Sequence, residues 1–267
     1  SLRNLTLVSE LRRSLGGGEL ILYYQPKVLL STGKVIGVEA LVRWRHPRYG
    51  LMFPDSFIPL AEQTGLINPL TQWVIAAALE QCRQWETRGV PLIIAVNLSA
   101  RNLLDMQFAD QLAVALQSVP QAARRLCLEI TETAMMADPV RALTILNALN
   151  DMGVTLSIDD FGTGYSSLSY IKQLPVNELK IDKSFVMGMG VSDDDIVIVR
   201  STIDLAHNIG FKVVAEGVED EATYNMLIEL NCDVAQGYYI SQPVLPDDIE
   251  VWLRESRWSL DESILNK

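Results

Sequence analysis

Histidine is scarce in this chain, with two residues in 267, and cysteine is little more common, with three. Two histidines argue against a histidine-rich zinc site, and no HExxH motif is present. The cysteines, Cys82, Cys127 and Cys232, are odd in number and far apart, and no two of them have CxxC spacing. This pattern argues against a disulfide framework and fits a reducing cytoplasm.

Basic clusters are also missing. The chain has 22 Lys and Arg residues against 33 Asp and Glu residues, a formal net charge of −11. A groove for a nucleic-acid polymer needs clustered Lys and Arg, and no such run exists. The phosphate-cradling motif GxxxxGK[ST] is missing too. If the ligand carries phosphate, a divalent metal recruited by acidic residues would have to neutralise it.

No apolar stretch reaches 18 residues, and no signal peptide opens the sequence. We therefore expect a cytoplasmic protein, either free or as the cytoplasmic domain of a larger, membrane-anchored one. Hydrophobic residues make up 49% of the chain, which is ample for a core and argues against disorder. A chain of this length fits one α/β barrel or two smaller domains.

Short apolar runs alternate with longer helical patterns along the chain. The apolar runs are Leu20–Val28, Val35–Leu41, Leu92–Val96, Leu126–Ile130, Val154–Ile158, Leu179–Ile181, Phe211–Ala215 and, more weakly, Asp233–Ala235. The helical stretches are Asn68–Arg88, Phe108–Val119, Pro139–Met152, Asp194–Ile209 and Glu221–Leu230. Gly89, Gly153 and Gly210 each follow a helical stretch and precede a strand, where a left-handed cap residue belongs.

Continuous apolar strands joined by helices predict a parallel sheet covered on its outside. Eight such strands in this length predict a closed barrel. The link between the first two strands, at Ser31–Gly33, is too short for a helical crossover, so those strands should pair antiparallel. The predicted fold is therefore α/β, a distorted (β/α)8 TIM-like barrel with an antiparallel first strand.

Polar residues stand at the ends of seven of these strands in succession. They are Glu39, Asn97, Glu129, the pair Asp159 and Asp160, Lys180, Glu216 and Gln236. In a barrel these ends open onto one face, which is where barrel enzymes carry their active sites. One acid after a strand is most often a helix cap or a solvated loop residue, but seven polar strand ends in succession indicate a site.

Five carboxylates in one mouth would repel one another. Two divalent cations would supply four positive charges, and the all-oxygen ligand set suits Mg²⁺ or Mn²⁺ over Zn²⁺ or Cu²⁺. Adjacent Asp159 and Asp160 would let one carboxylate bridge both ions while the other holds the second. Ions about 3.5–4 Å apart can activate a water and clamp a phosphoryl displacement. Lys180 can orient that water or stabilise charge on the phosphate.

The segment Glu39–Arg43 resembles the ExLxR signature of the EAL family of cyclic di-GMP phosphodiesterases. Further matches follow in the family's order within residues 19–255: Asn97–Ser99 (NxS), Glu129–Glu132 (ExTE), Asp159–Leu168 (DDFGTGYSSL), Leu179–Asp182 (LKID), Glu216–Glu219 (EGVE) and Gln236–Tyr238 (QGY). Each string is weak by itself, but together and in order they are specific.

The resemblance implies hydrolysis of one phosphodiester of cyclic di-GMP to give linear 5′-pGpG. It implies two Mg²⁺ or Mn²⁺ ions, held by Glu39, Asn97, Glu129, Asp159, Asp160 and Glu216. The catalytic residues that it implies are Lys180, Glu39, Asp159, Asp160, Glu216 and Gln236. Ca²⁺ should bind but inhibit, because its coordination shell is looser and larger.

The resemblance also implies residues that hold the substrate and support the site. Substrate should contact Gln25, Leu41, Arg43, Asp182 and Gln236, while Glu132 anchors the loop 161–168 and Glu219 lies behind the metal ligands. The segment Ile240–Pro243 departs from the family, which often has a basic residue there. That departure puts one peripheral contact in doubt and no metal ligand.

The domain organisation follows from the same comparison. Residues 1–18 are interpreted as a lead-in helix and linker, and residues 19–267 as the EAL phosphodiesterase domain. The lead-in shows no cyclase signature, so we expect fusion to sensory or GGDEF-type domains outside this chain. The family also suggests a homodimer formed through the helix after Ser166.

Two other functions stay open. Some EAL-like domains have lost catalytic residues and act as cyclic di-GMP receptors, although every expected ligand is present here. The same barrel could also hydrolyse another cyclic or linear dinucleotide, since guanine selectivity does not follow from these motifs.

Overall fold

The computed structural model describes residues 2–162 and 168–261. The strands are β1 (Leu20–Leu29), β2 (Lys34–His46), β3 (Gly50–Met52), β4 (Ile93–Leu98), β5 (Leu126–Thr131), β6 (Thr155–Phe161), β7 (Glu178–Ile181), β8 (Lys212–Ala215) and β9 (Val234–Ala235). The α-helices are α1 (Leu2–Gly17), α2 (Ile58–Thr64), α3 (Ile67–Thr87), α4 (Phe108–Gln117), α5 (Glu132–Met136), α6 (Pro139–Asp151), α7 (Leu168–Ile171), α8 (Lys183–Gly188), α9 (Asp193–Asn208), α10 (Glu221–Glu229) and α11 (Pro246–Glu255). Short 3₁₀ helices cover Pro54–Ser56 (η1), Asn102–Leu104 (η2) and Pro120–Arg125 (η3).

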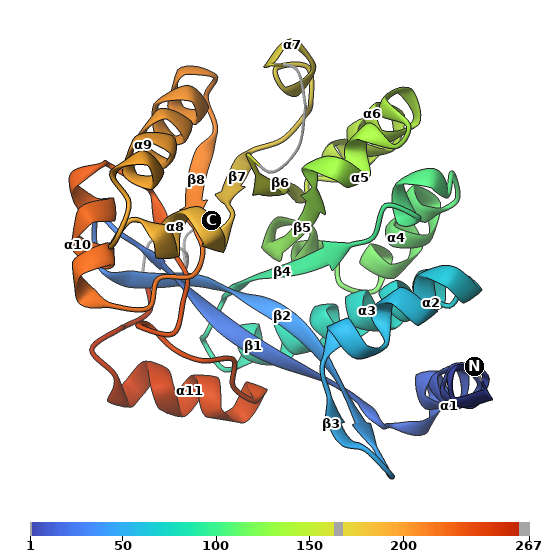
Figure 1. Cartoon of the computed structure of the whole chain (residues 1–267). Coiled ribbons are helices and arrows are strands. Elements are labelled where there is room, and N and C mark those ends of the chain that lie inside the picture. The colour runs from blue at the N-terminus through green and yellow to red at the C-terminus, as the bar shows by residue number, and fades with distance from the viewer. Residues whose placement is uncertain (1, 163–167, 262–267) are drawn as a thin grey trace.

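Eight strands close into a barrel in the order β1, β9, β8, β7, β6, β5, β4, β2, and β1 pairs again with β2. Strand β1 is antiparallel to both of its neighbours, whereas the other barrel strands run parallel. The longer helices lie around the outside (Figure 1). The distorted TIM-like barrel with an antiparallel first strand is thus confirmed.

The helix ends follow from the glycines. Gly89, Gly153 and Gly210 have φ angles of 76°, 84° and 89°, in the left-handed region that glycine adopts without steric cost. Each lets the chain leave a helix and turn into the next strand. The predicted caps are therefore confirmed.

Strand β2 is longer than the sequence pattern predicts, because it continues to His46. Its last three residues pair antiparallel with β3, a strand that the sequence analysis does not foresee. Gly50, with a φ of 70°, begins β3 at the turn of this hairpin. Since β3 has only three residues, it lacks the length from which a period of two can be recognised.

Helix α1 packs on the same edge of the barrel. Leu7 and Leu11 are buried in one cluster with Trp44 and Phe57. Glu10 is 3.0 Å from the buried ring of His46, measured from Oε2 to Nε2, so the helix is also tied to β2 by a polar contact. Residues 2–17 therefore pack against the barrel. Across the described ranges, no helix combines the length and apolar character needed to cross a bilayer.

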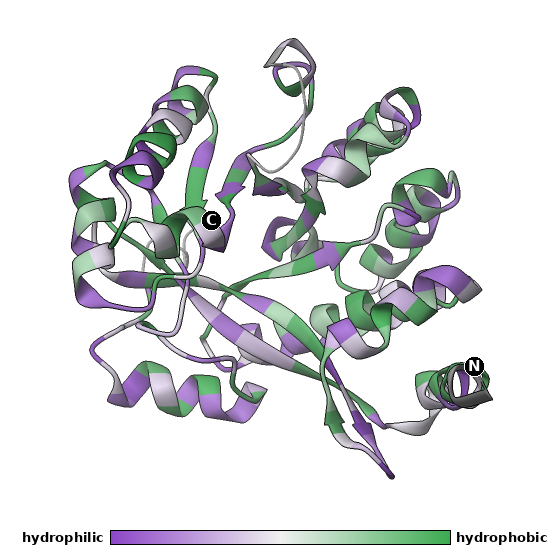
Figure 2. Ribbon diagram, viewed as in Figure 1, coloured by the Kyte–Doolittle hydropathy of each residue, from purple (hydrophilic) through white to green (hydrophobic). Residues whose placement is uncertain are grey.

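The barrel interior is polar, whereas the outer face of the strands is apolar. Alternate strand residues point to opposite sides, so Leu128 and Ile130 join the core while Glu129 between them points inward. Figure 2 shows polar residues set into otherwise apolar strands. Inside the barrel, the Glu129 carboxylate accepts from Lys27 at 2.5 Å through Oε1 and from Lys180 at 2.6 Å through Oε2. All three side chains are buried.

Replacing Lys27 with Met should lower the free energy of unfolding by about 3 kcal/mol, because it leaves Glu129 with one ammonium partner instead of two in a buried site. Urea unfolding followed by circular dichroism measures this loss. Lys212→Met, at an exposed position at the start of β8, is the matched control and should stay near the wild type. Equal stability of the two variants would contradict a structural role for this ion pair.

Candidate active site

Asp159 and Asp160, near the end of β6, are brought to one side by an irregularity in the strand. In a regular strand, consecutive side chains point to opposite faces. The register of β6 against β7 shifts between Ile158 and Phe161, and Asp160 has a φ of 53°, in the left-handed region. A bulge of this kind redirects a side chain. Carboxylate oxygens of Asp159, Asp160 and Glu216 consequently lie within 4.8 Å of one another.

Lys180 stands among the acids at the centre of the mouth. Its ammonium nitrogen is 2.6 Å from Glu129 and 2.6 Å from Glu216. It is also 3.5 Å from Asp159 and 3.6 Å from Glu39, and its side chain is fully buried. The strand-end residues predicted from β2, β5, β6, β7 and β8 are therefore together in space.

A chain of amide contacts joins the remaining strand ends. Asn97 donates to Glu39 Oε1 at 2.7 Å, and Gln236 donates to Glu39 Oε2 at 2.6 Å. Gln236 also donates to Gln25 on β1 at 3.0 Å. Gln25 in turn donates to the backbone carbonyl of Ser241 at 3.1 Å, within the segment that departs from the family pattern. The backbone of that segment thus orients Gln25.

The charges of the mouth divide the acids into two groups. Burial would raise the pKa of Glu129, but Lys180 and Lys27 outweigh it and lower that pKa to about 2. Burial raises the pKa of Glu216 to about 8, with Glu39 and Asp159 adding to the shift. Burial and neighbouring Asp159 and Asp182 raise the pKa of Asp160 to about 6. The two lysines therefore favour the ionised form of Glu129, whereas burial favours the protonated forms of Asp160 and Glu216, in Glu216 against the opposing effect of Lys180.

This donor set fits a hard divalent cation. Three carboxylates converge, all donors are oxygens, and two of the carboxylates have raised pKa values that a cation would reverse. The buried Oε1 of Gln236 has no hydrogen-bond partner within the described residues. Asp159, Asp160 and Glu216 could hold such an ion directly, with Glu39 and Asn97 beside them.

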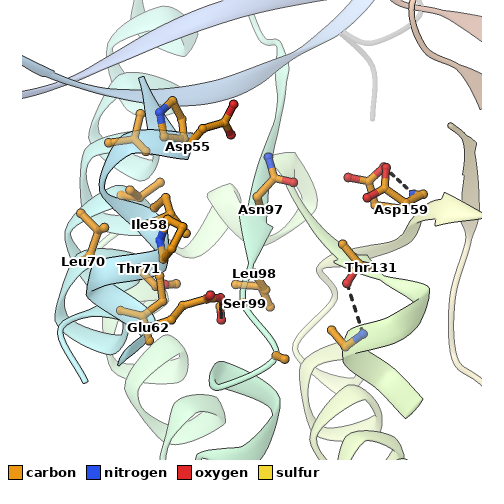
Figure 3. A pocket seen from close by; sticks show the side chains of 18 of the residues that line it. Asp55, Ile58, Glu62, Leu70, Thr71, Asn97, Leu98, Ser99, Thr131 and Asp159 are labelled. Atoms are coloured by element: carbon orange, nitrogen blue, oxygen red, sulfur yellow. Dashed lines mark hydrogen bonds between the residues drawn. The ribbon is translucent and has the colours of Figure 1, made fainter. Parts of the chain in front are cut away.

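Two cavities flank this cluster. One, of about 680 Å³, lies between the η1–α2–α3 side and the ends of β4, β5 and β6. Figure 3 shows Asn97 between Asp55 on one wall and Asp159 on the other. The second cavity, of about 450 Å³, is lined by Gln25, Glu39, Leu41, Arg43, Glu216, Glu219, Gln236 and their neighbours. Leu41 lines both cavities, so a ligand longer than either could extend across it.

The remaining predicted residues lie around this centre. Glu132 is buried and accepts from the Gly162 amide at 3.3 Å, at the start of the loop that it was expected to anchor. Asp182 caps helix α8 through Ser184 and shares a hydrogen bond with Asp160. Residues 163–167 of that loop, including Ser166 at the predicted dimer helix, lie outside the described residues.

Sequence reasoning missed Lys27, which completes the pairing of Glu129. One signal was available, since Lys27 interrupts an apolar run and lies two residues from Gln25, on the same face of the strand. It also missed Tyr23 and Phe53, whose rings lie beside the Arg43 guanidinium. Phe53 belongs to no regular pattern that would have pointed to it.

Comparison with known proteins extends these observations. A model of the EAL domain family matches residues 8–243. The chain is 45% identical over 241 residues to the bifunctional diguanylate cyclase/cyclic di-GMP phosphodiesterase MucR of Pseudomonas aeruginosa, covering 90% of this chain and 35% of MucR. It is 42% identical over 257 residues to the cyclic di-GMP phosphodiesterase NbdA of the same organism, covering 96% and 33%. The chain thus spans about a third of each of these two relatives.

Solved structures agree with the architecture. The PaMucR phosphodiesterase in complex with c-di-GMP superposes with a TM-score of 0.88 at 44% identity, covering 91% of this chain and 99% of that one. An EAL domain protein from Listeria monocytogenes superposes with a TM-score of 0.79 at 31% identity, covering 93% and 96%. The fold, the ordered motifs and the match over most of the sequence lead to one conclusion: this chain belongs to the EAL domain family.

Proposed function

We propose that this chain is a divalent-metal-dependent phosphodiesterase that opens cyclic di-GMP to linear 5′-pGpG. The observation that carries the proposal is the convergence of Glu39, Asp159 and Glu216 on a fully buried Lys180, with Asp160 beside Asp159 and Glu216. A site that only bound the dinucleotide would not need so concentrated a set of acids. Support for the substrate comes from MucR and NbdA, whose names describe cyclic di-GMP phosphodiesterases.

The ions we propose are two Mg²⁺ or Mn²⁺. The ligands would be Glu39, Asn97, Glu129, Asp159, Asp160 and Glu216, all of them oxygen donors. When bound, the ions would supply the positive charge that activates a water and stabilises a phosphate in displacement. Glu129 differs from the others because two lysines already neutralise it, so we expect it to be the weakest contributor of charge.

Lys180 is the proposed catalytic cation of the chain itself. It is buried, and Glu129 and Glu216 hold its ammonium group at 2.6 Å on two sides. A group fixed in this way can donate a hydrogen bond to the attacking water or to a phosphate oxygen without reorganising. Gln236, held between Glu39 and Gln25, would orient a neighbouring oxygen by hydrogen bonding.

The substrate would lie across the barrel mouth. We propose that Gln25, Leu41 and Arg43, which line the second cavity, contact it together with Gln236. Asp182 is also proposed as a contact, although its carboxylate is engaged at the start of α8. Glu132 and Glu219 are proposed to support the site, Glu132 at the start of the loop and Glu219 in the lining of the second cavity.

We also propose a wider context. MucR is named as bifunctional, and DosP of Escherichia coli, which is 38% identical over 250 residues and of which this chain covers 31%, is named as an oxygen sensor protein. By analogy, the chain would act beside sensory or GGDEF-type domains, in the cytoplasm, and as a homodimer.

The first experiment is turnover of cyclic di-GMP by the purified chain with Mg²⁺, Mn²⁺, Ca²⁺ or EDTA, with products separated by chromatography. We expect pGpG with Mg²⁺ or Mn²⁺, little with Ca²⁺ and none with EDTA, since Ca²⁺ takes a larger and looser shell. Tight binding without turnover under every condition would favour the receptor alternative. Preferential turnover of another dinucleotide in a competition assay would favour the second alternative.

Removing single groups should separate metal binding from chemistry. Asp160→Asn should reduce kcat about 10²–10³-fold by removing charge from the metal site, while the fold is retained. Lys180→Met should cause a loss of similar size but keep substrate binding. Asp194→Asn, an exposed acid on α9, is the control for the first variant and should match the wild type. A normal kcat for either site variant would contradict the role given to that residue.

Metal affinity should rise with pH. An entering cation must displace protons from Asp160 and Glu216, whose pKa values are raised to about 6 and about 8. The Mn²⁺ dissociation constant should therefore fall at least tenfold between pH 6 and pH 8.5, with proton release seen by calorimetry in two buffers.

The same raised pKa values should make the stability of the EDTA-treated, metal-free protein fall with pH, whereas metal affinity rises. A carboxyl group whose pKa is raised on folding stabilises the fold at pH values below its pKa in the unfolded chain. This contribution is lost as the pH rises through the pKa of the group in the folded protein. Without metal, stability should therefore fall between pH 6 and pH 8, and Mn²⁺ should restore it. A pH-independent Mn²⁺ affinity would show that the two acids are already ionised.

A further inference from the structure

Arg43 is a buried cation that forms no ion pair with a carboxylate among the described residues. Its exposed fraction is 7%, and it lines the 450 Å³ cavity at the mouth. Throughout the described ranges, no carboxylate oxygen lies within 4.0 Å of its guanidinium nitrogens. One nitrogen donates to the backbone carbonyl of Val42 at 3.0 Å. Charges this deeply buried are normally paired, so another contact must hold this side chain in place.

Two aromatic rings supply that contact. The guanidinium carbon of Arg43 is 4.7 Å from the centre of the Phe53 ring and 5.7 Å from that of Tyr23. Tyr23 lies on β1 opposite Leu41, and Phe53 is the residue after β3. Strand β2, which carries Arg43, pairs with both β1 and β3.

A ring holds an arginine differently from a carboxylate. A cation–π contact engages the face of the guanidinium, whereas a carboxylate occupies its N–H donors. The Arg43 donors that do not reach Val42 are thus left for an anion in the cavity. Phe53 is 54% exposed, which is a poor position for an aromatic ring whose only purpose is packing. Single exposed apolar residues are common, but this one lies on the cation of the site.

We propose that Phe53 and Tyr23 are positioning residues that aim the Arg43 guanidinium at a phosphate of the dinucleotide. The inference rests on the proposed function, because it assumes that the second cavity receives part of the substrate. The proposal gives the β2–β3 hairpin a role in substrate affinity, although β3 is not one of the eight strands of the barrel. A chain with an aliphatic residue at position 53 would hold Arg43 less firmly.

Steady-state kinetics with Mg²⁺ and cyclic di-GMP tests the proposal. Phe53→Leu keeps an apolar side chain but removes the ring, and KM should rise about 3- to 10-fold while kcat stays within twofold. Phe53→Tyr should restore the wild-type KM. Tyr49→Leu is the matched control, because Tyr49 is a partly exposed aromatic of the same hairpin whose ring lies against His46. An unchanged KM in Phe53→Leu would overturn the proposal, as would a fall in kcat alone.

A second readout does not depend on turnover. Ring currents should shift the Arg43 Nε–H proton in the NMR spectrum of the wild type, and Phe53→Leu should move this resonance while Tyr49→Leu leaves it in place. If the wild type neither binds nor cleaves cyclic di-GMP, the proposed function fails, and the NMR result alone decides whether the rings fix Arg43. An Arg43 resonance insensitive to Phe53→Leu would overturn the positioning role even in an active enzyme.

Discussion

Repulsion among carboxylates at one end of a barrel constrains everything else in this site. Four strands bring Glu39, Glu129, Asp159 and Glu216 within reach of a single ammonium group, that of Lys180. One lysine cannot neutralise four acids: burial, with Glu39 and Asp159 nearby, still raises the pKa of Glu216 although Lys180 lowers it. The second buried lysine, Lys27, compensates the negative charge of Glu129 only. What remains is a concentrated negative charge at the mouth, which is the condition for recruiting divalent cations.

The antiparallel β1 makes this arrangement possible. Its inward-facing residues descend through the barrel in the order of the chain, so Tyr23 lies near Arg43 at the rim, Gln25 contacts Gln236 and Lys27 reaches Glu129 inside. In the parallel strands the order is reversed, and the interior residue precedes the mouth residue. Strand β1 thus contributes at three depths of the barrel: Tyr23 beside the proposed substrate arginine, Gln25 in the amide network and Lys27 in the buried ion pair.

Much of this could be predicted from the sequence because barrel strands leave a repeated local signal. Seven of the eight apolar runs end in a polar residue, and the short link at residues 31–33 predicts the antiparallel pairing of the first two strands. Lys27 escaped prediction because its partner Glu129 is 102 residues away in the chain, so its place on the same face as Gln25 did not reveal what it contacts. The bulge at Asp160 and the short β3 escaped for a related reason, since each depends on a register that only the neighbouring strand defines.

The left-handed backbone at Asp160 also bears on how this position would tolerate change. Apart from glycine, Asn and Asp adopt such a conformation at the least cost, and most other side chains would be strained. Glycine would relax the backbone yet remove the carboxylate. A library of residues at position 160 sorted for folded protein should therefore enrich Gly and Asn, whereas one sorted for catalysis should retain Asp. Folding and chemistry thus impose different selection at a single residue.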